Sequence, residues 1–322
     1  MSDSPEGSSP SERSFRVTRA HVGSRLDRFL QAMMPVLSRS AVQAALDEGR
    51  VLLGSGHEAK AARRLQLDDE VTLLPRPAGP VPPPPPELLA GPGWVVVDKP
   101  AGLRTLGNAR HPGADLATAV GRSPAHRLDR FTSGCCLLTD GGDVATHFRE
   151  QFECHHVEKT YAAVVEGRPS WTRTTCELPL EPLPESRVPG RVIARPAAEA
   201  GPEARAAVTE LELVASAGDR SLLRVGLIHG RRHQVRAHAA ALGHPLVGDL
   251  LHGGDERRFV RFQLGQPVDC PEGLEPGRHL LHARSLAFTD VEGEQRSAVA
   301  PWPADFPSEL TAEWPDPLEP SE

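Results

Sequence analysis

Five consecutive prolines at positions 82–86 impose the strongest constraint on how this chain can fold. Proline has a fixed φ and no backbone N–H, so such a run is extended and cannot join the interior of a helix or a sheet. The run lies in a Pro-rich stretch, residues 76–92, between two segments with regular hydrophobic patterns. We therefore expect a semi-rigid linker at 76–92, which fits this position better than a ligand for a proline-binding module does.

The composition is that of an ordinary soluble protein. Hydrophobic residues make up 39% and charged residues 25% of the 322 residues, which is typical of globular domains. No apolar run approaches the length needed to span a bilayer, and the polar N-terminus lacks the apolar core of a signal peptide. The five cysteines include no CxxC pair. We expect a cytoplasmic protein with reduced thiols, no membrane association, and neither a disulfide framework nor a metal site.

The net charge of -7 at first argues against a nucleic-acid partner, but the charge is unevenly distributed. Residues 303–322 contain six acids and no Lys or Arg, whereas residues 11–76 contain eleven Lys or Arg and eight acids. The global charge therefore decides nothing about partners. We expect a disordered polar tail at 1–13 and an acidic flexible tail at 302–322.

Residues 14–75 have the pattern of a small α/β unit. Apolar residues at positions 26, 29, 30 and 33 have helical spacing, and Pro35 ends that helix. Ser38 can cap a second helix with apolar positions 42, 45 and 46. Short apolar runs predict strands at 51–53 and 71–74.

Residues 93–301 predict a larger domain in which strands outnumber helices. The expected helices lie at 143–153 and 231–242. The expected strands lie at 94–98, 135–138, 159–167, 206–215, 221–228 and 280–289. Hairpins mixed with helices predict an α+β fold with a mixed, largely antiparallel sheet.

The segment AHRLDRFTSGCCLLTD, residues 125–140, places one acid on a loop that leads directly into a buried strand. Such a loop can present the carboxylate of Asp129 to a substrate while the strand fixes its position. His126 or Arg127 could keep that acid ionised. An equally simple interpretation is that Asp129 caps a turn or pairs with Arg127 at the surface.

Four further segments accompany this loop in a characteristic order. They are Lys99-Pro100-Ala101-Gly102, Lys159-Thr160-Tyr161, His229-Gly230-Arg231-Arg232-His233-Gln234-Val235-Arg236 and Leu242-Gly243-His244-Pro245-Leu246-Val247-Gly248-Asp249. Together with HRLD and TSG, these motifs resemble those of pseudouridine synthases of the RluA type. The resemblance covers most of residues 14–301 and implies the pseudouridine synthase fold for 93–301.

The resemblance implies that the protein isomerises uridine to pseudouridine in RNA without a cofactor. Asp129 would be the essential carboxylate, Arg236 would form an ion pair with it, and Tyr161 would stack on a flipped uracil. Tyr161 is the only tyrosine of the chain, and without the resemblance it would be assigned to the core. The basic residues expected to contact RNA in this domain are His126, Arg127, Lys159, Arg231 and Arg232.

The first unit resembles the small RNA-binding domain named after a ribosomal protein of the S-four type. The matching segments are Arg25-Leu26-Asp27, Ser38-Arg39-Ser40, Gly49-Arg50-Val51 and Asp68-Asp69-Glu70-Val71. The resemblance implies phosphate contacts, which would come from Arg25, Arg28, Arg39 and Arg50. The alternative is that these arginines only solubilise helix surfaces.

Four departures from the family pattern concern the site itself. Phe131 stands where an acid is common, His229 and Arg232 replace two threonines, and His252 replaces a tyrosine. The expected partner is RNA, with ribosomal RNA of the large subunit favoured over transfer RNA, and the expected state is a monomer. Two other functions remain open: a non-catalytic RNA-binding or ribosome-assembly factor, and a glycoside hydrolase, although hydrolysis calls for a second carboxylate.

Overall fold

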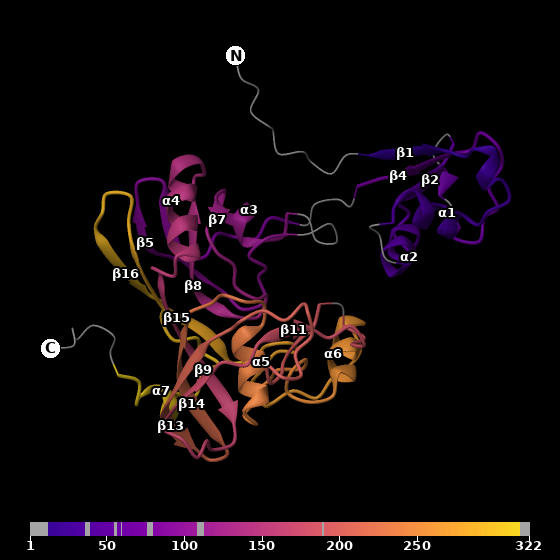
Figure 1. Ribbon diagram of the computed structural model, residues 1–322. Coiled ribbons are helices and arrows are strands. Elements are labelled where there is room, and N and C mark those ends of the chain that lie inside the picture. Colours follow the sequence, from indigo (N-terminus) through magenta and orange to yellow (C-terminus); the bar gives the residue numbers. More distant parts are fainter. Residues whose placement is uncertain are drawn as a thin grey trace. The chain divides into compact units, whose positions relative to one another are not determined.

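The structure, a computed structural model, describes residues 12–35, 39–54, 57, 58, 60–75, 80–107, 113–188 and 190–315. The chain divides into two compact units (Figure 1), one made of residues 1–81 with 107–114 and one of 82–106 with 115–322. Ser38, the expected helix cap, lies outside the described residues, as do most of the expected N-terminal tail and residues 76–79 of the expected linker.

The first unit packs two helices on an antiparallel sheet with the strand order β1-β4-β2-β3. Its elements are β1 Arg13–Arg16, η1 Arg19–His21, α1 Leu26–Met33, α2 Arg39–Asp47, β2 Val51–Leu53, β3 His57–Glu58 and β4 Glu70–Leu73. The helical spacing read from the sequence places Leu26, Phe29 and Leu30 in the core, as expected. Met33 is 38% exposed and Met34 is buried instead, because the helix ends at residue 33.

The second unit is organised around one long sheet, which Figure 1 shows running from β5 near one end to β13 near the other. The strand order is β10-β13-β14-β9-β15-β8-β6-β5, with β16 on β15 and β7 on β8. Among the described strand pairs of this sheet only β15 and β8 are parallel. The predicted α+β fold with a mixed, largely antiparallel sheet is therefore confirmed.

The bounds of these elements follow the hydrophobic pattern closely. The strands are β5 Glu87–Gly91, β6 Trp94–Lys99, β7 Ser123–Pro124, β8 Ser133–Thr139, β9 Glu158–Glu166, β10 Arg173–Cys176, β11 Leu180–Pro182, β12 Val192–Ala194, β13 Thr209–Ala217, β14 Arg220–Leu227, β15 Leu281–Thr289 and β16 Gln295–Val299. The helices are α3 Leu116–Val120, α4 Gly142–Glu153, α5 Gln234–Ala241, α6 Glu256–Gln263 and α7 Ser308–Thr311.

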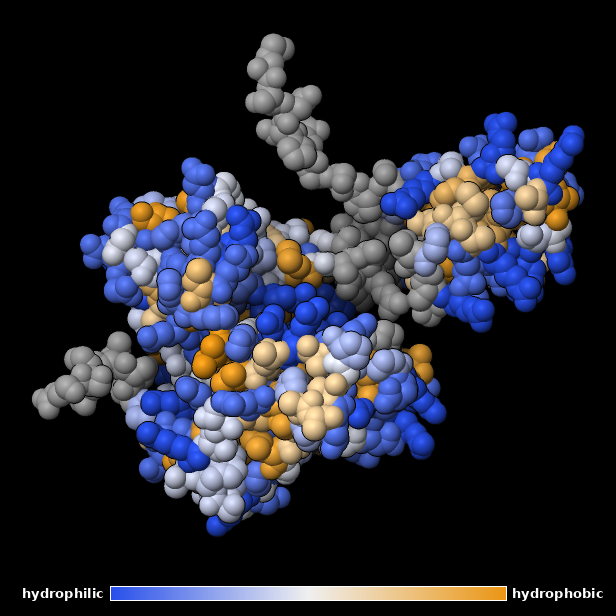
Figure 2. Space-filling view, in the orientation of Figure 1, coloured by the Kyte–Doolittle hydropathy of each residue, from blue (hydrophilic) through white to orange (hydrophobic). Residues whose placement is uncertain are grey.

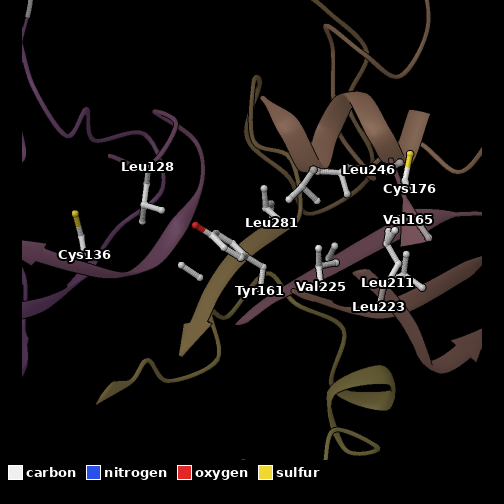
Figure 3. Packing of buried hydrophobic residues seen from close by; sticks show 14 of the residues in the cluster. Leu128, Cys136, Tyr161, Val165, Cys176, Leu211, Leu223, Val225, Leu246 and Leu281 are labelled. Atoms are coloured by element: carbon white, nitrogen blue, oxygen red, sulfur yellow. The ribbon is translucent and has the colours of Figure 1, made fainter. Parts of the chain in front are cut away.

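Alternation along the central strands gives the sheet two buried faces. On β9, Tyr161 and Val165 belong to one core cluster, whereas Ala162 and Val164 belong to another. Figure 3 shows the first cluster, in which Tyr161 lies beside Val225 and Leu281. The site described below lies on this first face, so the strands that support it are packed on both sides.

Two expected boundaries are wrong. Residues 87–91 of the expected linker form β5, which pairs with β6 and gives the sheet its edge. The segment 302–315 of the expected flexible tail packs on the sheet through Trp302, Phe306 and Trp314, together with Leu310 of α7. Burial of these large apolar side chains outweighs the disorder that the prolines and acids of the segment suggest. Residues 316–322 lie outside the described residues.

The expected helix at 231–242 begins only at Gln234. His233, at its N-cap, has φ 53°, which is outside the helical region. Arg236 therefore lies in the first turn of α5 and not deeper in the helix. Within the described ranges, none of the helices is long and apolar enough to cross a bilayer.

Phe306→Ala tests whether the C-terminal segment is part of the core. The side chain is 6% exposed, so its removal should lower the free energy of unfolding by about 3–5 kcal/mol. All four tryptophans (94, 171, 302 and 314) lie in the second unit, so their fluorescence during urea unfolding reports that unit alone. Leu264→Ala is the control, because Leu264 is 67% exposed and should change the stability by less than about 0.5 kcal/mol. An unchanged value for Phe306→Ala would show that the segment does not pack.

Candidate active site

Asp129 lies on the loop between β7 and β8, and a residue from α5 meets it there. Its Oδ2 accepts a hydrogen bond of 3.1 Å from Nη1 of Arg236. The side chain of Asp129 remains 23% exposed, whereas that of Arg236 is 7% exposed. The ion pair implied by the sequence motifs is therefore present. Among the described residues none donates a hydrogen bond to Oδ1 of Asp129, so that oxygen is free to meet a substrate.

Arg236 is held in turn by a second, fully buried acid. Its Nε and Nη2 donate to Oδ2 and Oδ1 of Asp249 at 2.7 and 2.9 Å, the bidentate geometry that fixes a guanidinium in direction. Asp249 also accepts from the backbone N–H groups of Leu251 and His252. The sequence motif that ends at Asp249 did not indicate this contact with Arg236.

The carboxyl of Asp129 is ionised at neutral pH. Burial by itself raises its pKa, but His233 when protonated and Arg236 more than offset this effect and lower the pKa to about 2. Burial also lowers the pKa of His233 to about 4, so His233 is neutral at pH 7. Arg236 is thus the cation that keeps Asp129 ionised near neutrality. The carboxylates of Asp249 and Asp129 outweigh burial and raise the pKa of Arg236 above its usual value.

Two buried basic side chains hold the backbone that follows Asp129. Nζ of Lys99 donates to the carbonyl of Arg130 at 3.3 Å, and to two carbonyls of the turn after β6. Burial lowers the pKa of Lys99 to about 7. Nη1 of Arg278 donates to the carbonyl of Phe131 at 2.7 Å, and its Nε pairs with Asp305 at 2.5 Å. The C-terminal segment thus supports the loop through Asp305.

Two buried histidines hold the end of the same loop. Nε2 of His279 lies 3.1 Å from Oγ1 of Thr132, and Nδ1 of His282 lies 2.9 Å from Oγ of Ser133. Burial keeps the pKa of both rings below the usual range, so both are neutral at pH 7. Gly134 follows with φ 106°, where a Cβ would lie 2.2 Å from the carbonyl oxygen of residue 283. Only glycine allows β8 to approach β15 this closely.

Tyr161 presents its ring on the face of the sheet that leads to this loop. It is 8% exposed and lies between Val225 of β14 and Ala283 of β15 in the strand register. In Figure 3 its oxygen points toward the segment that carries Leu128, the residue before Asp129. Burial raises the pKa of Tyr161, and the charge of Asp129 adds to the effect. The phenol is therefore neutral and close enough to Asp129 to sense its charge.

The predicted role of His126 as a charge beside Asp129 is wrong. Its Nε2 lies 3.1 Å from the backbone N of Leu137 and accepts its hydrogen, and its ring packs against Phe152 at 4.8 Å between centroids. Burial lowers the pKa of His126 to about 4, so the ring is neutral and supports β8. Lys159 lies nearby, with Nζ 5.8 Å from the centroid of Phe152, and burial lowers its pKa.

The remaining predicted residues of this domain are exposed cations. Arg127, Arg231 and Arg232 all lie at the surface. Figure 2 shows strongly hydrophilic residues filling the hollow between the part of the second unit that carries α4 and the part that carries α5 and α6. Within the described ranges no group of His, Cys, Asp or Glu side chains could hold a metal ion.

In the first unit, three of the four predicted arginines share one groove. Arg25, Arg28 and Arg39 line a groove of about 890 Å³, and Arg64, which sequence reasoning missed, adds to a neighbouring hollow of about 420 Å³ with Arg25 and Arg28. Arg25 also pairs with Asp27 at 2.8 Å. Arg50 lines neither hollow: it pairs with Glu48 at 2.7 Å and donates to the carbonyl of residue 74.

Arg236→Lys tests which cation sets the charge of Asp129. A lysine keeps one positive charge but cannot make a bidentate contact with Asp249 and also reach Asp129. We therefore expect the pKa of Asp129 to rise, measured as the titration of its carboxyl carbon by ¹³C NMR. Arg296→Lys is the control, since Arg296 pairs with Asp290 and should leave Asp129 unaffected. An unchanged pKa of Asp129 in Arg236→Lys would contradict this role of Arg236.

Comparisons with known proteins show which family the chain resembles. Residues 93–241 match a protein family described as RNA pseudouridylate synthase. An uncharacterized RNA pseudouridine synthase of Chlorobaculum parvum is 32% identical over 312 residues, 90% of this chain and 94% of the relative. The ribosomal large subunit pseudouridine synthase D of Xanthomonas campestris pv. campestris is 30% identical over 332 residues, 97% of this chain and 96% of the relative.

A solved structure shares the fold. The human protein RNA pseudouridylate synthase domain containing 1 aligns with a TM-score of 0.55 and 26% identity, over 71% of this chain and 87% of that one. The relatives above, at 30% identity or more, align over nearly their whole length. The chain therefore belongs to the RNA pseudouridylate synthase family, whose enzymes isomerise uridine in RNA.

Proposed function

We propose that Asp129, Arg236 and Tyr161 form the catalytic centre of this enzyme and that its substrate is ribosomal RNA of the large subunit. The observation that carries the first part is an ionised carboxylate with one oxygen engaged by Arg236 and the other free. This carboxylate lies on a loop that is hydrogen-bonded at each of the next four residues. Such support pre-organises a reacting group.

The isomerisation of uridine to pseudouridine replaces one glycosidic bond at C1′ of the ribose with another. The bond between C1′ and N1 of uracil breaks, a bond between C1′ and C5 forms, and the proton on C5 is replaced by one on N1. The free Oδ1 of Asp129 would act on the ribose, as a nucleophile at C1′ or as a base toward the C2′ proton. Atoms and electrons balance within the substrate, so no cofactor is required.

Tyr161 supplies the surface on which the detached uracil can turn. The target base must leave its stack, which costs a few kcal/mol, and an aromatic ring recovers part of this energy by stacking. A neutral phenol next to an ionised acid suits a neutral base. The exposed Arg127, Arg231 and Arg232 would contact the flanking phosphates. Lys159, also predicted to contact RNA, is only 9% exposed and does not fit that role. All these residues come from one chain, and we expect a monomer.

Asp129→Asn tests the catalytic assignment. The amide keeps the shape and a hydrogen-bond acceptor for Arg236 but removes the charge, so turnover should fall by a factor of about 10³. The measurement is tritium release from RNA labelled at C5 of uracil. Asp140→Asn is the control, because Asp140 is exposed and pairs only with Arg122 among the described residues. Full turnover in folded Asp129→Asn would refute the role of Asp129, and no turnover in the unaltered protein would favour a non-catalytic RNA-binding factor.

The choice of ribosomal RNA rests on the relative from Xanthomonas campestris, which is named for the ribosomal large subunit and aligns with 97% of this chain. We further propose that the first unit binds RNA through the groove lined by Arg25, Arg28 and Arg39. Ribosomal RNA suits the proposed reaction because it contains structured loops whose bases are already partly unstacked. Mapping pseudouridine in total RNA with and without the gene tests the target: sites restricted to transfer RNA would overturn the ribosomal assignment.

Salt dependence tests the groove. Each phosphate contact steepens the fall of log K with log salt by about 0.7–0.9, so Arg28→Ala with Arg39→Ala should flatten this slope by about 1.5. The measurement is RNA binding by fluorescence anisotropy between low and moderate salt. Arg50→Ala is the control, since Arg50 is paired with Glu48 and lies outside the groove. Equal slopes for the double variant and the unaltered protein would exclude phosphate binding there.

A further inference from the structure

His233 occupies a costly backbone position beside the candidate catalytic acid. Its φ of 53° lies in the left-handed region, which costs a residue with a Cβ about 1–2 kcal/mol relative to the right-handed conformation. Glycine or asparagine would adopt it more easily. Strained positions of this kind often serve a functional side chain. The imidazole, 12% exposed, faces Asp129.

The two ring nitrogens of His233 have different neighbours. Nε2 lies 3.9 Å from Oδ2 of Asp129, and Nδ1 lies 3.2 Å from Nε2 of His252. The two imidazole rings are nearly perpendicular, at 88°. The distance from Nε2 to Asp129 is too long for a hydrogen bond, so the dipole of the imidazole ring interacts there with the charge of the carboxylate. The distance from Nδ1 to His252 is within hydrogen-bond range.

Both rings are neutral at pH 7, so each carries a single N–H. Burial lowers the pKa of His233 to about 4 and that of His252 to about 3. The charged groups facing His233 are Asp129, Arg236, Arg232 and Asp249. Those facing His252 are Asp249, Arg236 and Arg191, along with the ring of His233.

The charge of Asp129 decides where the single proton of His233 lies. An N–H on Nε2 points a positive dipole end at the carboxylate, whereas a bare Nε2 would point a lone pair at it. With the proton on Nε2, Nδ1 is an acceptor. The contact with His252 is then a hydrogen bond only if Nε2 of His252 carries the proton.

We propose that His252 is a positioning residue that donates its Nε2–H to Nδ1 of His233 and so keeps the Nε2–H of His233 directed at Asp129. This inference deepens the proposed function of Asp129 and rests on it. The N–H dipole supports negative charge on Oδ2 and leaves Oδ1 for the substrate. The tyrosine common at this position in the family is also a donor, so this chain keeps the donor while changing the residue.

The first test reads the proton directly and needs no RNA. In protein labelled with ¹⁵N-histidine, two-dimensional NMR distinguishes the two nitrogens of each ring, and His233→Gln and His252→Phe assign the signals. We expect His233 to carry its proton on Nε2 at pH 7. A proton on Nδ1 of His233 would overturn the proposal, whatever the enzyme's activity.

The second test separates the donor from the ring. His252→Phe removes the donor and should lower kcat by between about 10-fold and 100-fold with little change in KM, and His233 should lose its preference for the Nε2 proton. His252→Tyr restores a donor and should recover most of kcat. His156→Phe is the control, because His156 is exposed. Unaltered kcat and unaltered His233 signals in folded His252→Phe would overturn the proposal; inactivity of the unaltered protein would count against the proposed function and leave the NMR result standing.

Discussion

The guanidinium of Arg236 between two carboxylates is the interaction on which the rest of the site depends. Asp249 has no exposed surface, and a buried carboxylate without a partner would be strongly destabilising. Arg236 makes that burial tolerable, and Asp249 in turn fixes the plane of the guanidinium through two hydrogen bonds. Three N–H groups of Arg236 remain, and one on Nη1 donates to Asp129. The acid on the loop is placed by a contact between two other elements, α5 and the turn that precedes His252.

The loop that carries Asp129 is rigid because partners reach it from several parts of the chain. Lys99 comes from the end of β6, and Arg278 comes from the segment before β15. Arg278 is 3% exposed and is itself neutralised by Asp305. The segment 302–315 is therefore linked to the site by an ion pair as well as to the core by its aromatic rings. A substitution in that segment would therefore affect the position of Asp129 through the contact of Arg278 with the loop.

The sequence predicted the parts of this arrangement that depend on local pattern. Short apolar runs predicted the central strands, and the resemblance to the family implied the ion pair of Asp129 with Arg236. Contacts between distant residues had no such signal: nothing near Asp249 or Lys99 in the sequence indicated that they would contact Arg236 and the carbonyl of Arg130. The C-terminal segment did carry a signal, because residues 302, 306, 310 and 314 are all large and apolar. The prolines of the segment, and the six acids among residues 303–322, obscured it.

The charge balance of the site bears on the role of the exposed cations in the same unit. At pH 7 Asp129, Arg236 and Asp249 together carry one net negative charge, since burial keeps His233, His252 and His279 neutral. Lys99, whose pKa is about 7, offsets part of this charge. An acid of this kind repels the phosphates of RNA but not a neutral uracil. Arg127, Arg231 and Arg232 lie at the surface of the same unit, where they can neutralise phosphates without reaching the buried carboxylates. In the function we propose, this separation would let the RNA backbone bind at the surface while only the flipped nucleoside approaches Asp129.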